Sequence, residues 1–213
     1  MTEQISKASS FKRIYAIARE EGMGVDVVSA GEIYTALQAG FPMEQVWFHS
    51  NNKTDWDIAF AMDNGVGCFV VDNREELDAI NAIAGEKGLK QPIMLRITPG
   101  IDPHTYEAVA TGKVDSKFGT AIETGQALEM VGYAASLQNI ILKGLHCHVG
   151  SQVFGEDIFE RASEVMLAFM KQCSDAFGIQ LEHLDMGGGY GVRYWTATAM
   201  WTFPKPSAVW QPI

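Results

Sequence analysis

The stretch Gly144-Leu145-His146-Cys147-His148-Val149-Gly150-Ser151-Gln152 has the pattern of a short buried strand that runs into a loop. Side chains alternate along a strand, so His146 and His148 share one face and the apolar residues around them share the other. Two imidazoles inside an apolar run need polar partners or a ligand. Residues 184–191 repeat the arrangement, because an apolar strand there breaks into Gly187-Gly188-Gly189, whose bare amides suit an anion such as phosphate.

The composition of the 213-residue chain is ordinary for a soluble globular protein, with 47% hydrophobic and 20% charged residues. The formal net charge of -10 and the lack of a basic run argue against nucleic-acid binding. No apolar stretch is long enough to cross a bilayer, and the first residues do not resemble a signal peptide. Cys68, Cys147 and Cys173 are odd in number and predict reduced thiols in a cytoplasmic protein.

Helix and strand patterns alternate along most of the chain. Helices are expected over 11–21, 32–39, 54–65, from 73 onward, 123–135 and 158–177. Strands are expected over 25–29, 46–49, 67–72 and 93–97, in the His146 stretch and before the triple glycine. Near-continuous Val, Ile and Leu in these strands predict a parallel sheet with both faces covered. Six strands that repeat in this way favour a (β/α) barrel over an open doubly wound sheet.

Polar side chains gather where the expected strands end, which is where barrel enzymes build their sites. These residues are Asp26, Ser29, His49, Asp72, Arg96, Thr98, His148, Ser151, Asp185 and Gly187. A helix cap is the simpler interpretation of some of them, and we favour it for Asp72 but not for the histidine pair or the glycine run. We therefore expect a ligand site at the carboxyl ends of the strands.

In its longer motifs the chain resembles the diaminopimelate decarboxylases, a family of pyridoxal-phosphate enzymes of the alanine-racemase-like barrel class. Besides the two stretches above, the matching segments are 24–32, 48–53, 65–68, 95–102, 104–105, 111–113 and 115–119. The histidine and glycine motifs are shared with ornithine- and arginine-type decarboxylases, whereas the loop from Pro99 to Gly119 is closer to the diaminopimelate branch. The resemblance covers Lys7 to Tyr194. It implies decarboxylation of meso-diaminopimelate to L-lysine with pyridoxal 5'-phosphate as cofactor and a small amino acid as substrate.

The resemblance implies catalytic roles for Lys7 and His148. Lys7 aligns with the family's Schiff-base lysine, although Gln4-Ile5-Ser6-Lys7-Ala8 keeps only the Lys-Ala pair of the family's Tyr-Ala-x-Lys-Ala run. Such a lysine must be partly desolvated, because only its neutral amine attacks an aldehyde. His148, in the run His-Val-Gly-Ser, aligns with the histidine that stacks on the cofactor ring.

The resemblance also implies a set of cofactor contacts. The full set is Lys7, Asp26, Arg96, His148, Ser151, Gly187, Gly188 and Gly189, with no metal. Ser151 and the three glycines align with phosphate contacts, Arg96 with an arginine near the ring, and Asp26 with an acid in the pocket. A strand arginine inside an apolar run also needs an anionic or acceptor partner on physical grounds alone.

Both ends of the chain depart from the family pattern. We expect residues 1–194 to form an incomplete TIM-type (β/α)8 barrel that lacks the last barrel strand and the C-terminal β domain. Residues 195–213 are expected to be an irregular tail outside the resemblance. The family's Glu-Pro-Gly-Arg run has no counterpart here. The family is homodimeric and completes its site across the dimer interface, so we expect a fragment that neither decarboxylates nor dimerises on its own.

Three alternatives stay open. Another decarboxylase of the same barrel type, acting on ornithine, arginine or carboxynorspermidine, would share the main motifs, although His104-Thr105 argues against it. A metal-dependent hydrolase would use His146-x-His148 as a ligand pair with His49 and Asp185, but it leaves the triple glycine unexplained. The third alternative is a non-catalytic chain that binds the cofactor or pairs with a full-length subunit.

Overall fold

The structure, a computed structural model, describes residues 3–5, 10–102, 112 and 118–192. Its first half contains β1 (Glu3–Ile5), α1 (Lys12–Glu20), β2 (Gly24–Val27), α2 (Ala30–Gln38), the 3₁₀ helix η2 (Met43–Gln45), β3 (Val46–Phe48), α3 (Asp55–Asp63) and β4 (Cys68–Val71). Its second half contains α4 (Arg74–Glu86), β5 (Gln91–Thr98), β6 (Thr120–Ala121), α5 (Gln126–Ser136), β7 (Ile140–His146), α6 (Glu156–Phe177) and β8 (His183–Asp185). Lys7, His104-Thr105 and the tail expected over 195–213 lie outside the described residues.

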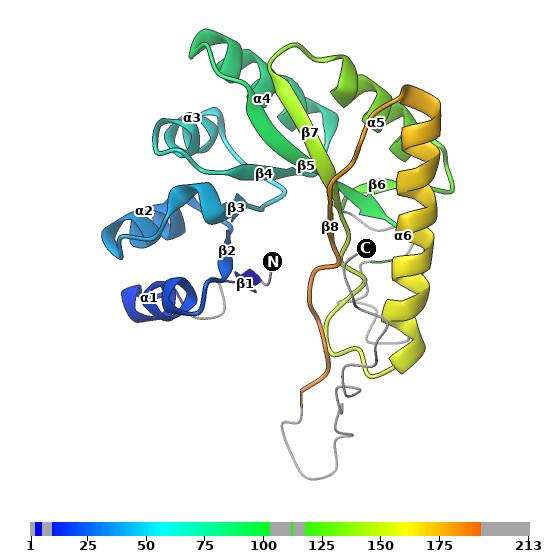
Figure 1. The fold of residues 1–213 in the computed structure, drawn as a ribbon, viewed down its shortest axis with the longest axis horizontal. Helices are drawn as coiled ribbons and strands as arrows, with labels where there is room; N and C mark the ends of the chain where they lie inside the picture. Colours follow the sequence, from blue (N-terminus) through cyan, green and yellow to red (C-terminus); the bar gives the residue numbers. More distant parts are fainter. Residues whose placement is uncertain (1–2, 6–9, 103–111, 113–117, 193–213) are drawn as a thin grey trace.

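The strands form a parallel sheet in the order β1-β2-β3-β4-β5-β7-β8, and the short β6 pairs with β5. Each strand of this path lies beside the preceding one, so the chain winds in one direction and its helices fall on one side of the sheet. Figure 1 shows an arc of strands from β1 to β8 with the helices outside it. A doubly wound sheet would reverse its strand order. The topology therefore confirms the expected partial barrel.

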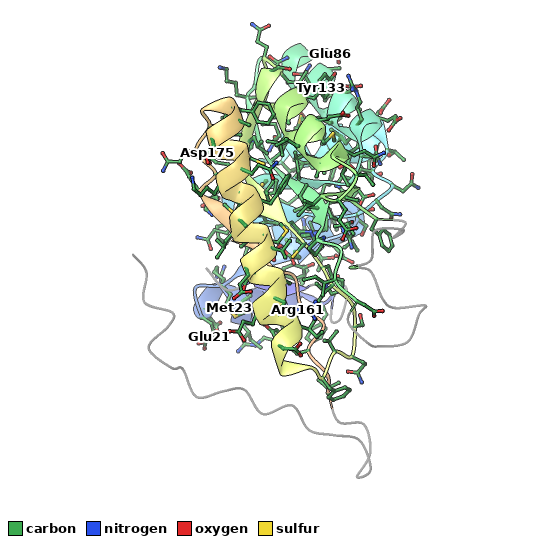
Figure 2. All side chains as sticks on the ribbon, turned by 90° about the vertical axis from the view of Figure 1, so that its right-hand side faces the viewer. Glu21, Met23, Glu86, Tyr133, Arg161 and Asp175 are labelled. Carbon is green, nitrogen blue, oxygen red and sulfur yellow. The ribbon has the colours of Figure 1, made fainter. Side chains whose placement is uncertain are left out.

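The two faces of the curved sheet carry different side chains. The outer face packs against the helices in the main core, to which Val27, Phe48, Phe69 and Leu95 contribute. The helix α6 covers one end of this core, and Figure 2 shows it running from Arg161 toward Asp175. None of the helices in the described ranges is long and apolar enough to cross a membrane.

The inner face carries a separate apolar cluster of Cys68, Val70 and Met94, with Trp47 packed against it. Because strand side chains alternate, the polar residues two positions further along β4 and β5, Asp72 and Arg96, lie on this same inner face. The inside of the arc is therefore apolar in the middle of the strands and polar at their carboxyl ends.

Two helix starts expected from the sequence are confirmed by their hydrogen bonds. Thr54 caps α3 in a reciprocal capping box with Asp57. Asn73 caps α4, because its side chain accepts the backbone N–H of Glu76 at 2.9 Å. These caps fix the turns that lead out of β3 and β4 and hold the strand ends in place.

The strand at the histidine stretch is shorter than expected. β7 ends at His146, and only the Cys147 N–H, which donates to the Asp185 carbonyl at 2.9 Å, continues the ladder with β8. Leu145, Cys147 and Val149 are fully buried, but His146 is buried as well, with 3% of its surface exposed. His148, however, follows the strand rather than lying in it, so the two histidines have different neighbours.

We predict that Gly144→Ala destabilises the sheet between β7 and β8. A Cβ at this position would lie 2.0 Å from the carbonyl oxygen of His183, which is backbone and cannot turn away. We expect a loss of about 1–3 kcal/mol in the free energy of unfolding, measured by urea denaturation. Gly31→Ala is the control, because its Cβ would meet nothing closer than the Ser29 Oγ at 3.7 Å. Equal stability of the two variants would contradict the prediction.

Candidate functional site

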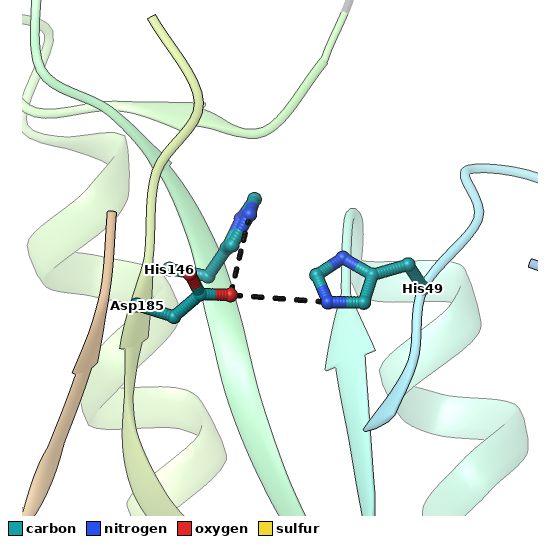
Figure 3. A group of neighbouring side chains, drawn as sticks. All are labelled: His49, His146 and Asp185. Atoms are coloured by element: carbon teal, nitrogen blue, oxygen red, sulfur yellow. Dashed lines mark ion pairs between the residues drawn. The ribbon is translucent and has the colours of Figure 1, made fainter. Parts of the chain in front are cut away.

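Four polar side chains meet inside the arc at the carboxyl ends of β2, β3, β7 and β8. These residues, the inner polar cluster, are Asp26, His49, His146 and Asp185. The His49 Nε2 atom lies 3.3 Å from Asp26 Oδ1 and 3.9 Å from Asp185 Oδ2. The His146 Nε2 atom lies 3.6 Å from the same Asp185 oxygen, and the two imidazole rings meet edge to face at 4.8 Å. Figure 3 shows the Asp185 carboxylate between the two histidines.

Asp26 and His146 are buried and His49 and Asp185 are partly buried, but the hydrogen bonding of the inner polar cluster is incomplete. Within the described part of the chain, Asp26 Oδ1, His49 Nε2, His146 Nδ1 and Asp185 Oδ2 are buried and have no hydrogen-bond partner of good geometry. Burial raises the pKa of Asp185 to about 6, while it lowers the pKa of His146 well below its usual value. Buried polar atoms without partners are rare in native proteins. The cluster is therefore a candidate for the polar wall of a ligand site.

The same cluster bears on the metal-dependent hydrolase, which the sequence leaves open as an alternative. In the described residues, the group whose candidate ligand atoms lie within 4.8 Å of one another is His49, His146 and Asp185, and His148 is not part of it. The further ligands of that alternative, His49 and Asp185, do come together with His146. The pair His146-x-His148, on which the hydrolase alternative rested, is not the pair that the structure groups.

His148 lies against the triple glycine. A Cβ on Gly187 would come within 2.8 Å of the His148 Nδ1 atom, and a Cβ on Gly189 would come within 1.8 Å of the Gly150 carbonyl. Both glycines have positive φ, 65° and 102°, which other residues rarely adopt. Glycine is therefore required at these two positions both by backbone conformation and by the close approach of the His148 loop.

The amides of the triple glycine are not equivalent. The Gly187 N–H donates to Asp185 Oδ1 at 2.7 Å, so it is already engaged. Neither the Gly188 nor the Gly189 N–H donates to an acceptor within the described ranges. Two of the three amides expected to hold an anion are thus available, and the third instead orients the Asp185 carboxylate.

The loops after β7 and β8 are joined beyond the cluster. The Val192 N–H donates to the Gln152 side-chain oxygen at 2.8 Å, and Gln152 has a φ of 57°. Ser151 is exposed in this loop, directly after Gly150 and before Gln152. Ser151 therefore lies on the same loop as His148, whereas the position of Lys7 lies outside the described residues.

Arg96 has an anionic partner, the kind that the sequence predicts for an arginine in an apolar strand. Its NH1 atom lies 3.8 Å from Asp72 Oδ1, and its guanidinium lies over the ring of Phe118 at 4.5 Å. Burial lowers the pKa of Arg96 and raises that of Asp72. The expectation that Asp72 is only a helix cap is wrong, because Asn73 caps α4 and the Asp72 carboxylate accepts the Gly119 N–H at 3.1 Å.

Sequence reasoning missed the role of Lys53. The Lys53 side chain is fully buried and donates to Glu76 Oε1 at 2.6 Å and to the carbonyls of Ser50 and Val70 at 2.8 Å. Burial lowers the pKa of Lys53 and raises that of Glu76. The segment 48–53 matches a family motif, but only the fold brings its lysine to the first turn of α4.

Comparison with known proteins identifies the class of this chain. Residues 5–212 match the family model described as pyridoxal-dependent decarboxylase, pyridoxal binding domain. The chain therefore belongs to this family. The buried polar atoms without partners and the two available glycine amides at the strand ends fit the family's pyridoxal cofactor.

The relatives narrow the family further. The diaminopimelate decarboxylase of Bacillus methanolicus is 43% identical over 189 residues, which cover 89% of this chain and 44% of that protein. A crystal structure of diaminopimelate decarboxylase from Helicobacter pylori complexed with L-lysine has a TM-score of 0.84 and 32% identity over 92% of this chain and 50% of its own. A lysine/ornithine decarboxylase from Vibrio vulnificus complexed with putrescine has a TM-score of 0.76 and 27% identity over 94% and 49%. The chain thus spans about half the length of these relatives.

We predict that Asp185 makes the stability of the fold depend on pH. Its pKa is about 6 in the folded chain against 3.8 as the reference value, so the folded chain holds the proton more tightly. The stability it contributes is fully present below the reference pKa and is lost as the pH rises through about 6. The loss amounts to about 3 kcal/mol.

The test compares the unaltered chain with Asp185→Asn by urea unfolding from about pH 4 to about pH 7. The Asn variant cannot ionise at this position. As the pH rises, the unaltered chain should therefore lose free energy of unfolding relative to Asp185→Asn. Parallel pH profiles of the two chains would contradict the prediction.

Proposed function

We propose that this chain forms the cofactor-binding half of a diaminopimelate decarboxylase. The observation that carries the proposal is the inner polar cluster beside the Gly188 and Gly189 amides, at the carboxyl ends of parallel strands. The 43% identity to a diaminopimelate decarboxylase over most of the chain supports the same assignment. The substrate on this proposal is meso-diaminopimelate and the product is L-lysine.

The glycine amides and the His148 loop are the proposed holders of the cofactor phosphate. The Gly188 and Gly189 N–H groups have no protein acceptor in the described residues and can donate to a phosphate without a competing side chain. Ser151 adds a hydroxyl from the facing loop. His148 packs against Gly187 and Gly189, so its flat imidazole is proposed to cover the ring face.

Asp26 and Arg96 are proposed to complete the pocket from β2 and β5. Pyridoxal phosphate supplies a ring that accepts the electron pair left when carbon dioxide departs. Asp26 holds a buried acceptor atom without a partner of good geometry, so it can receive a proton or a hydrogen bond from a group in the pocket. Arg96 keeps positive charge on the inner face, where it can attract a carboxylate.

Lys7 and Lys53 are the two lysines that need to be told apart. Lys53 has the lowered pKa expected of a reactive amine, but Glu76 and two carbonyls take its three N–H groups. A lysine held in this way cannot turn toward an aldehyde without leaving a buried charge unpaired. We therefore propose Lys7, and not Lys53, as the lysine that bonds to the cofactor.

We predict that pyridoxal phosphate, followed by borohydride reduction, labels this chain on Lys7. Peptide mapping by mass spectrometry should find the pyridoxyl group there, and Lys7→Ala should lose it. Lys171→Met, which replaces an exposed lysine of α6, is the matched control and should retain the label on Lys7. Label on Lys53, or label spread over surface lysines, would contradict the proposed site.

The substrate proposal is tested by adding different amino acids to the cofactor-loaded chain. The alternative is a lysine/ornithine type of decarboxylase, which one of the structural relatives represents. Meso-diaminopimelate should change the absorbance of the cofactor-loaded chain at lower concentration than ornithine or arginine. A preference for ornithine would favour the alternative branch.

The proposed function includes a cellular location and a protein partner for this chain. The three cysteines are free and buried, which supports a reducing compartment such as the cytoplasm. Pairing with a second copy, as expected of the family, is proposed to require the part of the relatives that this chain does not span.

A further inference from the structure

A chain of buried polar contacts begins at Lys53 and leads toward the site without belonging to the inner polar cluster. The Lys53 ammonium donates to Ser50, Val70 and Glu76, so it ties the loop after β3 to β4 and to the first turn of α4. Its side chain is 0% exposed and that of Glu76 is 4% exposed. A buried ion pair of this kind holds its members in one arrangement, because any other leaves a charge unpaired.

Glu76 passes this constraint to Asp72. While its Oε1 atom accepts from Lys53, its Oε2 atom accepts the backbone N–H of Asp72 at 3.1 Å. The Glu76 N–H in turn donates to the Asn73 cap. The backbone at the end of β4 is therefore fixed from α4, and the Asp72 side chain is directed to the inner face.

Asp72 then touches two elements that approach the pocket. Its Oδ1 atom accepts the Gly119 N–H at 3.1 Å and lies 3.8 Å from the Arg96 guanidinium. A Cβ on Gly119 would come within 2.9 Å of the Arg96 carbonyl, so the segment lies directly on β5. The Thr98 hydroxyl donates to the Phe118 carbonyl at 2.8 Å and holds the same segment from β5.

We propose that Asp72, oriented by Glu76 and Lys53, is a positioning residue that holds Arg96 and the Phe118-Gly119 segment at the pocket. The proposal rests on the proposed function, because it places Arg96 and the Phe118-Gly119 segment on one side of the proposed cofactor and substrate site. Asp72 acts through these neighbours. It does not need to touch a ligand.

The carboxylate performs two separable tasks. One oxygen accepts the Gly119 N–H, which an amide oxygen can also do. The negative charge faces Arg96 and keeps the guanidinium over the Phe118 ring, which an amide cannot do. Asp72→Asn therefore removes the second task alone, whereas Asp72→Ala removes both.

The experiment measures two quantities on the whole chain. Amide hydrogen exchange of Gly119, followed by NMR without cofactor, reports on the segment. The dissociation constant of pyridoxal phosphate, from absorbance titration, reports on the pocket. Asp78→Asn is the control, because it removes the same charge from an exposed carboxylate of α4 and leaves the contacts of Gly119 and Arg96 in place.

We expect Asp72→Ala to speed Gly119 exchange about tenfold or more, since it removes a hydrogen bond to a charged acceptor. Asp72→Asn should leave that exchange nearly unchanged but should raise the dissociation constant at least about threefold, as Asp72→Ala should also do. Asp78→Asn should change neither of the two measured quantities.

Unchanged Gly119 exchange in Asp72→Ala would overturn the proposal, and so would an equal loss of affinity in Asp72→Asn and Asp78→Asn. If the unaltered chain does not bind pyridoxal phosphate, the proposed function fails on its own. The Gly119 exchange then still decides whether Asp72 holds the segment.

Discussion

The parallel register of the sheet is the constraint on which the site depends. Arg96 pairs with His146 and His146 pairs with Asp185 across three neighbouring strands, so their side chains stand level on one face. Asp26 pairs with Trp47 in the same way on the other side of the arc. A shift of one residue in any of these pairs would turn the side chain to the outer face. The outer core of apolar side chains fixes the register and thereby places the polar ones.

The polar inner face costs stability, and nearby groups offset part of this cost. Asp185 keeps its proton more readily than a free carboxylic acid, and His146 stays neutral, so the cluster avoids several buried charges. Lys53, in the loop after β3, and Glu76, on α4, neutralise each other. The Gly187 amide orients the Asp185 carboxyl group. The polar side chains of the cluster are thus held in place before any ligand binds. Such preorganisation lets a site bind its ligand without rearrangement.

The sequence predicts the elements and the class of the site because these depend on local patterns and on one-dimensional motifs. The capping residues Thr54 and Asn73 are recognisable from the chain alone, and so is the glycine run after β8. The Lys53 contacts are not, since they join residues far apart in the chain through a corner that forms only in the folded sheet. Asp72 was misassigned for the same reason: its neighbour caps the helix, and its true partners lie on β5 and beside β6.

The most direct test is the response of the Gly188 and Gly189 amides to pyridoxal phosphate, observed by NMR with glycine-selective ¹⁵N labelling. The account predicts that these two resonances shift on titration, with a change smaller at Gly187, whose N–H is already bonded to Asp185. If these two resonances do not move while the chain still takes up the cofactor, the cofactor binds elsewhere and the site assigned to the inner face is wrong.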